Sequence, residues 1–200
     1  MQKIALTLRR GATADIPIRV ESDTLAYASI TAIPQRSPLR ITAQAHGVPD
    51  GWRAALQNVG GMTNLNVDSV RDVDLLRVSK IDANTLEFTG INAAGWRAYT
   101  SGGQVVSYAP HDLSVYASAR MDVKDSIDGT TLASNSTAGG TLQIDSAAGS
   151  VWIHLTAAQT LLLDAGTHLF DIEMVKASGV VVALCSADST LTVLPEITTS

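Results

Sequence analysis

Alternation of apolar and polar residues over short segments is the feature of this sequence that most limits its fold. Segment 4–9 reads IALTLR and segment 16–20 reads IPIRV, so alternate side chains point to one face of an extended strand. Similar segments recur along the chain, and nearly all are short and bounded by Gly, Asn, Asp or Pro. The predicted strands are 4–9, 16–20, 28–33, 40–45, 53–59, 73–81, 85–89, 105–108, 114–124, 141–144, 151–155, 168–175, 180–185 and 189–194.

Many short strands without long helical segments between them predict an all-β chain, as an antiparallel sandwich or barrel. Pro17 has no backbone N–H for a ladder, so its strand should be an edge strand or contain a bulge. One short helix is expected between strands. Thr156 and Gln159 have the spacing of a capping box at its start, and Gly166 is a plausible end with positive φ.

Two regions differ in organisation. Segment 37–103 has its own strands and turns and two of the three tryptophans, Trp52 and Trp96. We therefore expect residues 37–103 to form a small inserted domain. The flanks, 1–36 and 104–200, should close together into a second domain.

Charge and cysteine content exclude several classes of function. The chain has 14 basic and 19 acidic residues and an isoelectric point near 5.2, so it offers no broad positive field for nucleic acid. Charged residues make up 16% of the chain, against about 25% in ordinary soluble domains, which suits neutral, assembled surfaces. The single cysteine, Cys185, excludes an intramolecular disulfide and a cysteine-based metal cluster, and we expect it to be buried.

The sequence also gives no sign of a membrane segment. No apolar stretch reaches the roughly 18 residues that span a bilayer. The start of the chain alternates from Ile4 to Arg9 and lacks the unbroken apolar stretch of a signal peptide. We therefore expect a protein that is made in a cytoplasm, with no membrane partner.

Residues with catalytic or metal-binding chemistry are scattered. The histidines have no metal-ligand spacing, and motifs for a nucleophile elbow or a phosphate loop are absent from the sequence. The best metal candidates, Asp122, Asp125 and Asp128, are three residues apart and are explained more simply by a hairpin turn at Asp128-Gly129. Asp171 and Glu173 alternate on one predicted solvated strand face. We predict no enzyme, no catalytic or cofactor-binding residue, no cofactor and no metal site.

The aromatic residues allow two interpretations. A sugar-stacking platform is one, and packing in the core is the other. Aromatic residues are only 4% of the chain, which favours packing. The residues concerned are Trp52, Trp96, Tyr99, Tyr108 and Tyr116.

The stretches ITAQAHGVPDGWRAALQNVGGMTNLN (41–66) and VSKIDANTLEFTGINAAGWRAYTSGG (78–103) resemble a small β-barrel module of tail and virion proteins of tailed bacteriophages. That module is similar to the first-catalytic-cysteine-half domain of ubiquitin-activating enzymes. The resemblance is carried by the turn His46-Gly47, the turn 61–66, the motif 84–88 and the aromatic, glycine-rich exit 96–103. Ala54 stands where the module has valine, and the link 67–77 is longer than usual.

The rest of the chain resembles an immunoglobulin-like domain of phage baseplate upper proteins and related tail proteins. The stretches are SYAPHDLSVYASARMDVKD, GGTLQIDSAAGSVWIHLTAAQTLLL and THLFDIEMVKASGVVVALCSADSTLTVLPEITT. The matching positions are Arg120-Met121, 156–160, 170–173 and Glu196-Ile197-Thr198, whereas Ala187-Asp188 replaces a common glycine. The implied fold is an immunoglobulin-like antiparallel sandwich interrupted by the small barrel.

The resemblance implies a non-enzymatic virion structural protein in a phage tail, baseplate or fibre-attachment region. Its partners would be other virion proteins and further copies of itself, and it would reside in the virion after assembly in the host cytoplasm. The family pattern carries no catalytic residue. Three alternatives stay open: a capsid decoration or head-to-tail joining protein, a host-glycan-binding module, and a depolymerase, for which the sequence alone does not locate the required carboxylate pair.

Exposed hairpin tips and edge strands are the expected places of contact with partner chains. Two segments of the predicted barrel fit this description. The candidate contact residues are Val48, Pro49, Asp50, Gly51, Trp52, Trp96 and Tyr99.

Overall fold

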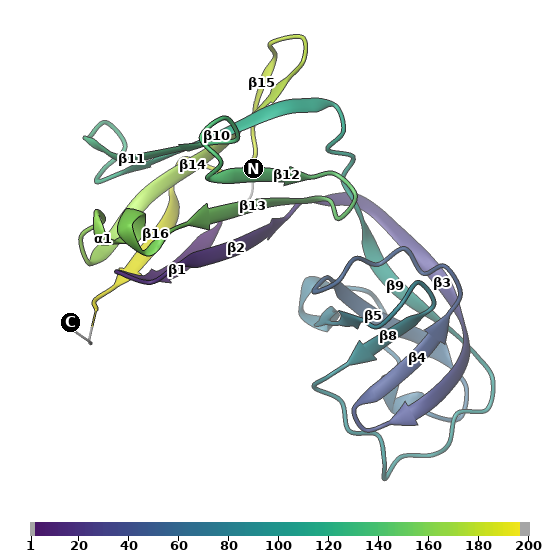
Figure 1. Cartoon of the computed structure of the whole chain (residues 1–200). Coiled ribbons are helices and arrows are strands. Elements are labelled where there is room, and N and C mark those ends of the chain that lie inside the picture. The colour runs from purple at the N-terminus through teal and green to yellow at the C-terminus, as the bar shows by residue number, and fades with distance from the viewer. Residues whose placement is uncertain (1–2, 197–200) are drawn as a thin grey trace. The chain divides into compact units, whose positions relative to one another are not determined.

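The computed structural model describes residues 3–196, without the side chain of Asp72, so Ile197 and Thr198 of the baseplate-like motif lie outside the described residues. The chain divides into two compact units (Figure 1). Unit 1 comprises Met1–Ile18 and Asp112–Ser200, and unit 2 comprises Arg19–His111. Both are built from β-strands, and the single short α-helix of the described chain lies in unit 1, so the predicted all-β class is confirmed.

Unit 1 contains two sheets. The larger has the order β1-β16-β14-β10-β11, with β15 also paired to β14, and the smaller has the order β12-β13-β2. β1 runs parallel to β16, whereas the other pairs of the larger sheet are antiparallel. The strands are β1 (Ala5–Arg9), β2 (Ala14–Arg19), β10 (Tyr116–Lys124), β11 (Thr131–Ser136), β12 (Leu142–Asp145), β13 (Ser150–Leu155), β14 (Gly166–Lys176), β15 (Val181–Ala183) and β16 (Ser189–Leu194).

Alternation along these strands builds the core of a sandwich. In β10 the side chains of Ala119, Met121 and Val123 are buried, and those between them reach the surface. β14 and β13 follow the same pattern. Pro17 lies in β2, which ends the smaller sheet, so the predicted edge position is confirmed. Cys185 is 1% exposed, as predicted.

Helix α1 (Ala157–Leu161) begins where the sequence predicts. The Thr156 hydroxyl accepts a hydrogen bond from the Gln159 N–H at 3.3 Å, and the Gln159 Oε1 accepts one from the Thr156 N–H at 2.8 Å. The predicted end at Gly166 is wrong, because the helix ends at Leu161 and Gly166 starts β14. Leu163, two residues beyond the helix, lies in the core and is 2% exposed.

Unit 2 is one seven-stranded sheet with the order β6-β5-β9-β3-β4-β8-β7. Only Val78 separates β6 from β7, the two ends of this order, so the sheet curls into a nearly closed barrel (Figure 1). The elements are β3 (Glu21–Arg36), β4 (Leu39–Ala43), β5 (Arg53–Val59), the 3-10 turns η1 (Thr63–Leu65) and η2 (Asp72–Asp74), β6 (Leu76–Arg77), β7 (Ser79–Lys80), β8 (Thr85–Phe88) and β9 (Gly102–Pro110).

The boundaries of the units differ from those expected. Unit 2 extends beyond 37–103 at both ends, because β3 and β9 pair with each other from Ser29–Gln104 to Glu21–Pro110. These residues therefore belong to the barrel-like sheet, and the expected flanks 1–36 and 104–200 each lose a strand to it.

One predicted strand is wrong and one is missed. Segment 73–81 contains η2, β6 and β7 in place of a single strand, because its buried residues Leu75 and Val78 are three positions apart. β11, with the sequence TLASNS, has too few apolar residues to stand out, and it is formed by pairing with β10.

Candidate functional site

The first predicted contact segment lies largely inside the barrel core. Val48 and Trp52 are 2% and 1% exposed, and Pro49 is buried. The indole N–H of Trp52 donates to the Tyr108 carbonyl oxygen at 3.1 Å. The expected exposure of this hairpin tip is therefore wrong for these three residues, because the barrel needs the large Trp52 ring as core filling.

Asp50 and Gly51 reach the surface in the same segment. They line a groove of about 460 Å³ with Leu76, Arg77 and Ile91 among the other walls. The Asp50 carboxylate accepts a hydrogen bond from the backbone N–H of Lys80 at 2.8 Å, which ties the tip to β7. Of this segment, only Asp50 and Gly51 are available to a partner.

His46 has a structural role in this segment. Its side chain is buried, its Nδ1 accepts from the Val48 N–H at 3.0 Å, and its Nε2 lies 3.1 Å from the Asp82 carbonyl oxygen. A carbonyl only accepts, so the proton must be on Nε2. Burial lowers the pKa of His46, which keeps the ring neutral.

The second predicted contact segment is a fixed loop. Arg36 donates to the carbonyl oxygens of Ala93, at 3.1 Å, and Trp96. Tyr99 Oη lies 3.2 Å and 3.0 Å from the carbonyl oxygens of Ile30 and Gly102. Trp96 and Tyr99 are half-buried and pack against the barrel core, so each presents only part of its ring to a partner.

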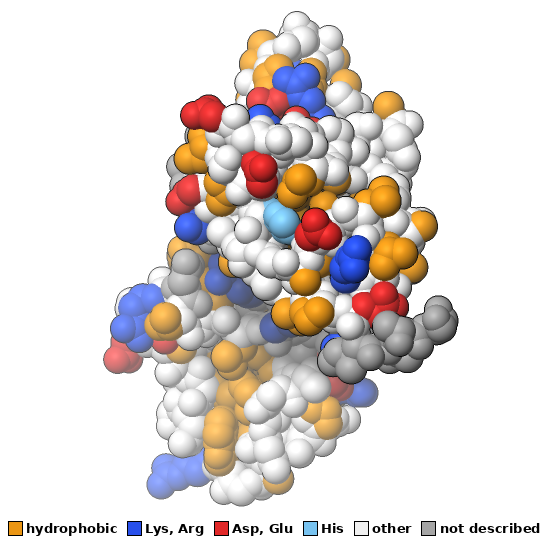
Figure 2. All heavy atoms as spheres, turned by 90° about the vertical axis from the view of Figure 1, so that its left-hand side faces the viewer, with side chains coloured by type: hydrophobic (Ala, Val, Ile, Leu, Met, Phe, Trp, Pro, Cys, Tyr) orange, Lys and Arg blue, Asp and Glu red, His pale blue; other side chains and the backbone are white. Residues whose placement is uncertain are grey.

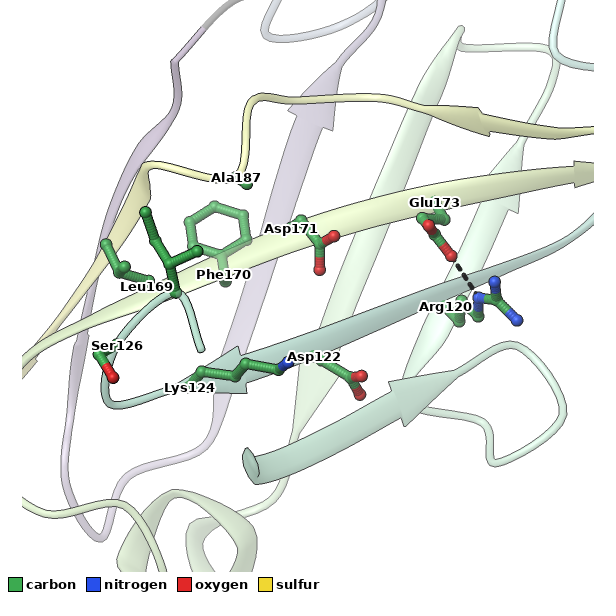
Figure 3. A pocket seen from close by; sticks show the side chains of 10 residues that line it. Arg120, Asp122, Lys124, Ser126, Leu169, Phe170, Asp171, Glu173 and Ala187 are labelled. Atoms are coloured by element: carbon green, nitrogen blue, oxygen red, sulfur yellow. Dashed lines mark hydrogen bonds and ion pairs between the residues drawn. The ribbon is translucent and has the colours of Figure 1, made fainter. Parts of the chain in front are cut away.

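A hollow of about 290 Å³ lies on the outer face of β10 and β14 in unit 1 (Figure 3). Its floor is made of outward side chains of the two strands together with the buried Phe170, and its rim includes the β10–β11 turn and Ala187. The lining residues are Arg120, Asp122, Lys124, Ser126, Ile127, Leu169, Phe170, Asp171, Glu173 and Ala187.

Carboxylates meet across the two strands in this hollow. Arg120 is opposite Glu173 and pairs with it at 2.5 Å, whereas Asp122 is opposite Asp171 and the two carry like charges. Burial, with the negative charges of Glu173 and Asp122, raises the pKa of Asp171. The Ser134 hydroxyl donates to the Asp122 carboxylate at 2.7 Å. Alternation predicted that Asp171 and Glu173 share a face, but not that Asp122 faces them.

The hollow does not have the features of a metal centre. Asp125 belongs to the turn that joins β10 to β11, away from the strand position of Asp122. Among the residues with described side chains, no group of three His, Cys, Asp or Glu residues is arranged to hold a metal ion. Two basic and three acidic side chains beside apolar walls suit the binding of a polar or charged segment.

A third group lies on the outer face of the smaller sheet. His154 Nδ1 is 2.6 Å from an Asp15 carboxylate oxygen, and the Trp152 ring is parallel to the His154 ring with centroids 5.9 Å apart. His154 Nε2 is buried and has no hydrogen-bond partner among the described residues. The sequence alone did not indicate that these side chains lie together. The spacing by two in β13 would have placed Trp152 and His154 on one face. The pairing of β13 with β2, which brings Asp15 to His154, could not be predicted from neighbouring residues in the sequence.

Comparison with known proteins gives no family assignment, because no protein-family model and no curated protein matches this chain. Within the described part of the chain, no helix is long and apolar enough to cross a membrane.

Proposed function

We propose that this chain is a non-enzymatic structural protein of a tailed-bacteriophage virion, in the tail, baseplate or fibre-attachment region, where it docks other virion proteins. The observation that carries the proposal is the combination of two fold types. The motifs in 41–103 resemble a small phage β-barrel, and this segment lies in a barrel-like sheet; the motifs in 107–199 resemble a phage sandwich domain, and their described part lies in a sandwich.

The surfaces support a docking role. The hollow of unit 1 combines both signs of charge with apolar walls, and the groove of unit 2 is lined by Asp50, Arg77 and Leu76. Such mixed surfaces are typical of contacts between proteins that fold separately and then assemble. The other virion proteins are the proposed partners.

A premature stop codon in the reading frame tests this proposal. Phage that carry the stop should produce particles with incomplete tails or baseplates, visible by electron microscopy, and the intact chain supplied from a plasmid should restore them. Normal, infectious particles made without the chain would overturn the proposal. Defects confined to head decoration or to the joint between head and tail would favour the capsid alternative.

A host-glycan-binding module is the second candidate, because of Trp152. Its ring is half-buried on a sheet face that also carries His154, Asp15 and Gln143. Aromatic rings beside polar groups are suited to stacking on a sugar and bonding its hydroxyls. A glycan array probed with the intact chain tests this candidate: binding that is lost in Trp152→Ala but kept in Trp96→Ala would support it, and no binding would exclude it for the glycans on the array.

A further inference from the structure

Strand β15 has one unpaired edge. It forms a hairpin with β14, in which Val175 pairs with Val181, Met174 with Val182 and Glu173 with Ala183. No other described strand pairs with β15. The hairpin projects from the sheet in Figure 1, so a strand can reach this edge from solvent.

The hydrogen bonds of the hairpin show which backbone groups are free. The Lys176 N–H donates to the Val180 carbonyl oxygen at 2.9 Å, and the Leu184 N–H donates to the Ile172 carbonyl oxygen at 2.7 Å. Bonded pairs alternate along an antiparallel ladder, so Val182 also directs its N–H and C=O toward β14. Val181 and Ala183 therefore direct theirs toward the free edge.

The side chains at this edge are apolar and exposed. Val180, Val181 and Val182 are 52%, 45% and 37% exposed, and no charged residue occurs from Ala177 to Ala187. Figure 2 shows orange side chains at its top, where the hairpin lies. Edge strands usually carry charges, proline or polar side chains that prevent pairing. Pro17 protects β2 in this way, and β15 has no such residue.

We propose that β15 pairs antiparallel with β15 of a second copy of this chain, about a two-fold axis through Val182. In this register Val181 of one chain is opposite Ala183 of the other, and the reverse. All four outward N–H and C=O groups of each strand then form hydrogen bonds, and the two Val182 side chains meet directly. Any other antiparallel register would leave some of the outward N–H and C=O groups of Val181 and Ala183 without a partner. The positions of these groups therefore favour the register centred on Val182.

The contact is small, and this determines how it should be measured. Three residues per strand bury far less than the roughly 1,000 Å² of a stable interface, so the dimer is weak in dilute solution and favoured where copies are held close together, as in an assembly. Pairing between two copies of this chain needs no other virion protein. The outcome of its test therefore does not depend on whether the proposed function is right.

Cysteine cross-linking tests the register. In a non-bonded antiparallel pair the Cα atoms are about 4.5 Å apart, within the range of about 4.4–6.8 Å that a disulfide spans. Val182→Cys should therefore form a disulfide-linked dimer under mild oxidation. Val180→Cys is the matched control, because it is more exposed but its two copies would be about 13 Å apart along the strands. The unaltered chain controls for Cys185, which is buried.

A dimer from Val182→Cys at least tenfold more abundant than from Val180→Cys is the expected result, and equal yields or no dimer from either variant would overturn the proposal.

A second variant, Val181→Pro in the Val182→Cys background, removes one outward N–H without removing a bond to β14. It should abolish the cross-link while the thermal unfolding midpoint changes little. A cross-link that persists in the proline variant would contradict the pairing. Sedimentation of the unaltered chain from about 10 μM to about 1 mM should show reversible dimerisation, and this measurement does not depend on whether the variants fold.

Discussion

His46 and Gly61 show at the scale of single residues how the barrel core is fixed. The neutral His46 ring joins two loops of unit 2, because Nδ1 accepts from Val48 and Nε2 donates to Asp82. Gly61 has φ of 78°, and a Cβ added there would lie 2.2 Å from the Ala98 carbonyl oxygen. A substitution at either residue should therefore change the stability of unit 2 in a way that can be measured.

Acid should weaken unit 2 through His46. The folded-state pKa is lowered below the usual value near 6.5, so the unfolded chain binds a proton first as the pH falls. Stability contributed by the neutral ring is present above pH 6.5 and lost below it, by up to about 1.4 kcal/mol per pH unit. Urea unfolding at pH 7.5 and pH 5.5 should show this loss, and His46→Gln should be less stable at pH 7.5 but lack this part of the pH dependence. An unchanged slope in the variant would exclude His46 as the cause.

Gly61→Ala should destabilise unit 2 by at least about 2 kcal/mol, since both the backbone conformation and the clash with Ala98 oppose a side chain. Gly90→Ala is the matched control, because its added Cβ would meet no atom within 4 Å and its φ is not positive. Its effect should lie within about 0.5 kcal/mol. Urea titration of both variants measures the difference. Equal stabilities would mean that residues 60–62 do not approach Ala98 as closely as described.

At the scale of elements, the register of β10 against β14 creates the charged hollow. It places Asp122 opposite Asp171 and Arg120 opposite Glu173. Like charges directly opposite each other in a sheet are unfavourable, typically by about 0.2–1 kcal/mol. Only one of these two cross-strand pairs is complementary, so the exposed face of the sandwich is not optimised for stability alone.

Asp171→Asn should raise the stability of the sandwich at neutral pH. The pKa of Asp171 is raised in the folded state, so its ionised form opposes folding, and this cost is lost as the pH falls from the raised folded-state pKa to the unfolded value near 3.9. We expect a gain of about 0.5 kcal/mol at pH 7 and almost none at pH 3. Hydrogen exchange of β10 and β14 amides measures it, with Asp128→Asn in the exposed turn as control. A gain of the same size at both pH values would show that charge repulsion is not its source.

Alternation identified most of the strands, and the capping box located the start of α1, because these signals depend on a few neighbouring residues. The exposure of Trp52 was predicted wrongly, since a turn sequence does not show whether a core lies beneath it. The hairpin turn predicted at Asp128-Gly129 joins β10 to β11, and Gly129 is needed there for space: its φ is not positive, but an added Cβ would lie 1.8 Å from the Asp125 carboxylate. The hollow was not predictable, because Asp122 and Asp171 are 49 positions apart in the sequence and meet only when β10 pairs with β14.

At the scale of the whole molecule, the chain is one continuous unit inserted into another that is discontinuous. The ends of the inserted unit lie together, because Glu21 pairs with Pro110 and the His111 N–H donates to the Val20 carbonyl oxygen at 2.8 Å. Neighbouring ends allow insertion of a domain into a loop without distortion of its host. Such an arrangement gives one chain two separate compact units.

Fragment 19–111 should therefore fold alone. Its sheet and its hydrophobic core are formed by residues within this range. We expect a cooperative urea transition and a blue-shifted fluorescence from the buried Trp52 in the isolated fragment. Fragment 37–103, which lacks all of β3 and most of β9, is the control and should not fold. A fragment 19–111 without a cooperative transition would contradict the division into units.

The location of the chain in phage particles tests the proposed function most directly. Purified virions would be separated into heads and tails, and each fraction would be probed with an antibody against this chain. Signal confined to tails is the expected result, and signal on heads would move the chain to capsid decoration or joining. Absence from both fractions would contradict the structural assignment and return attention to an enzyme, with Asp122 and Asp171 as the first carboxylates to test.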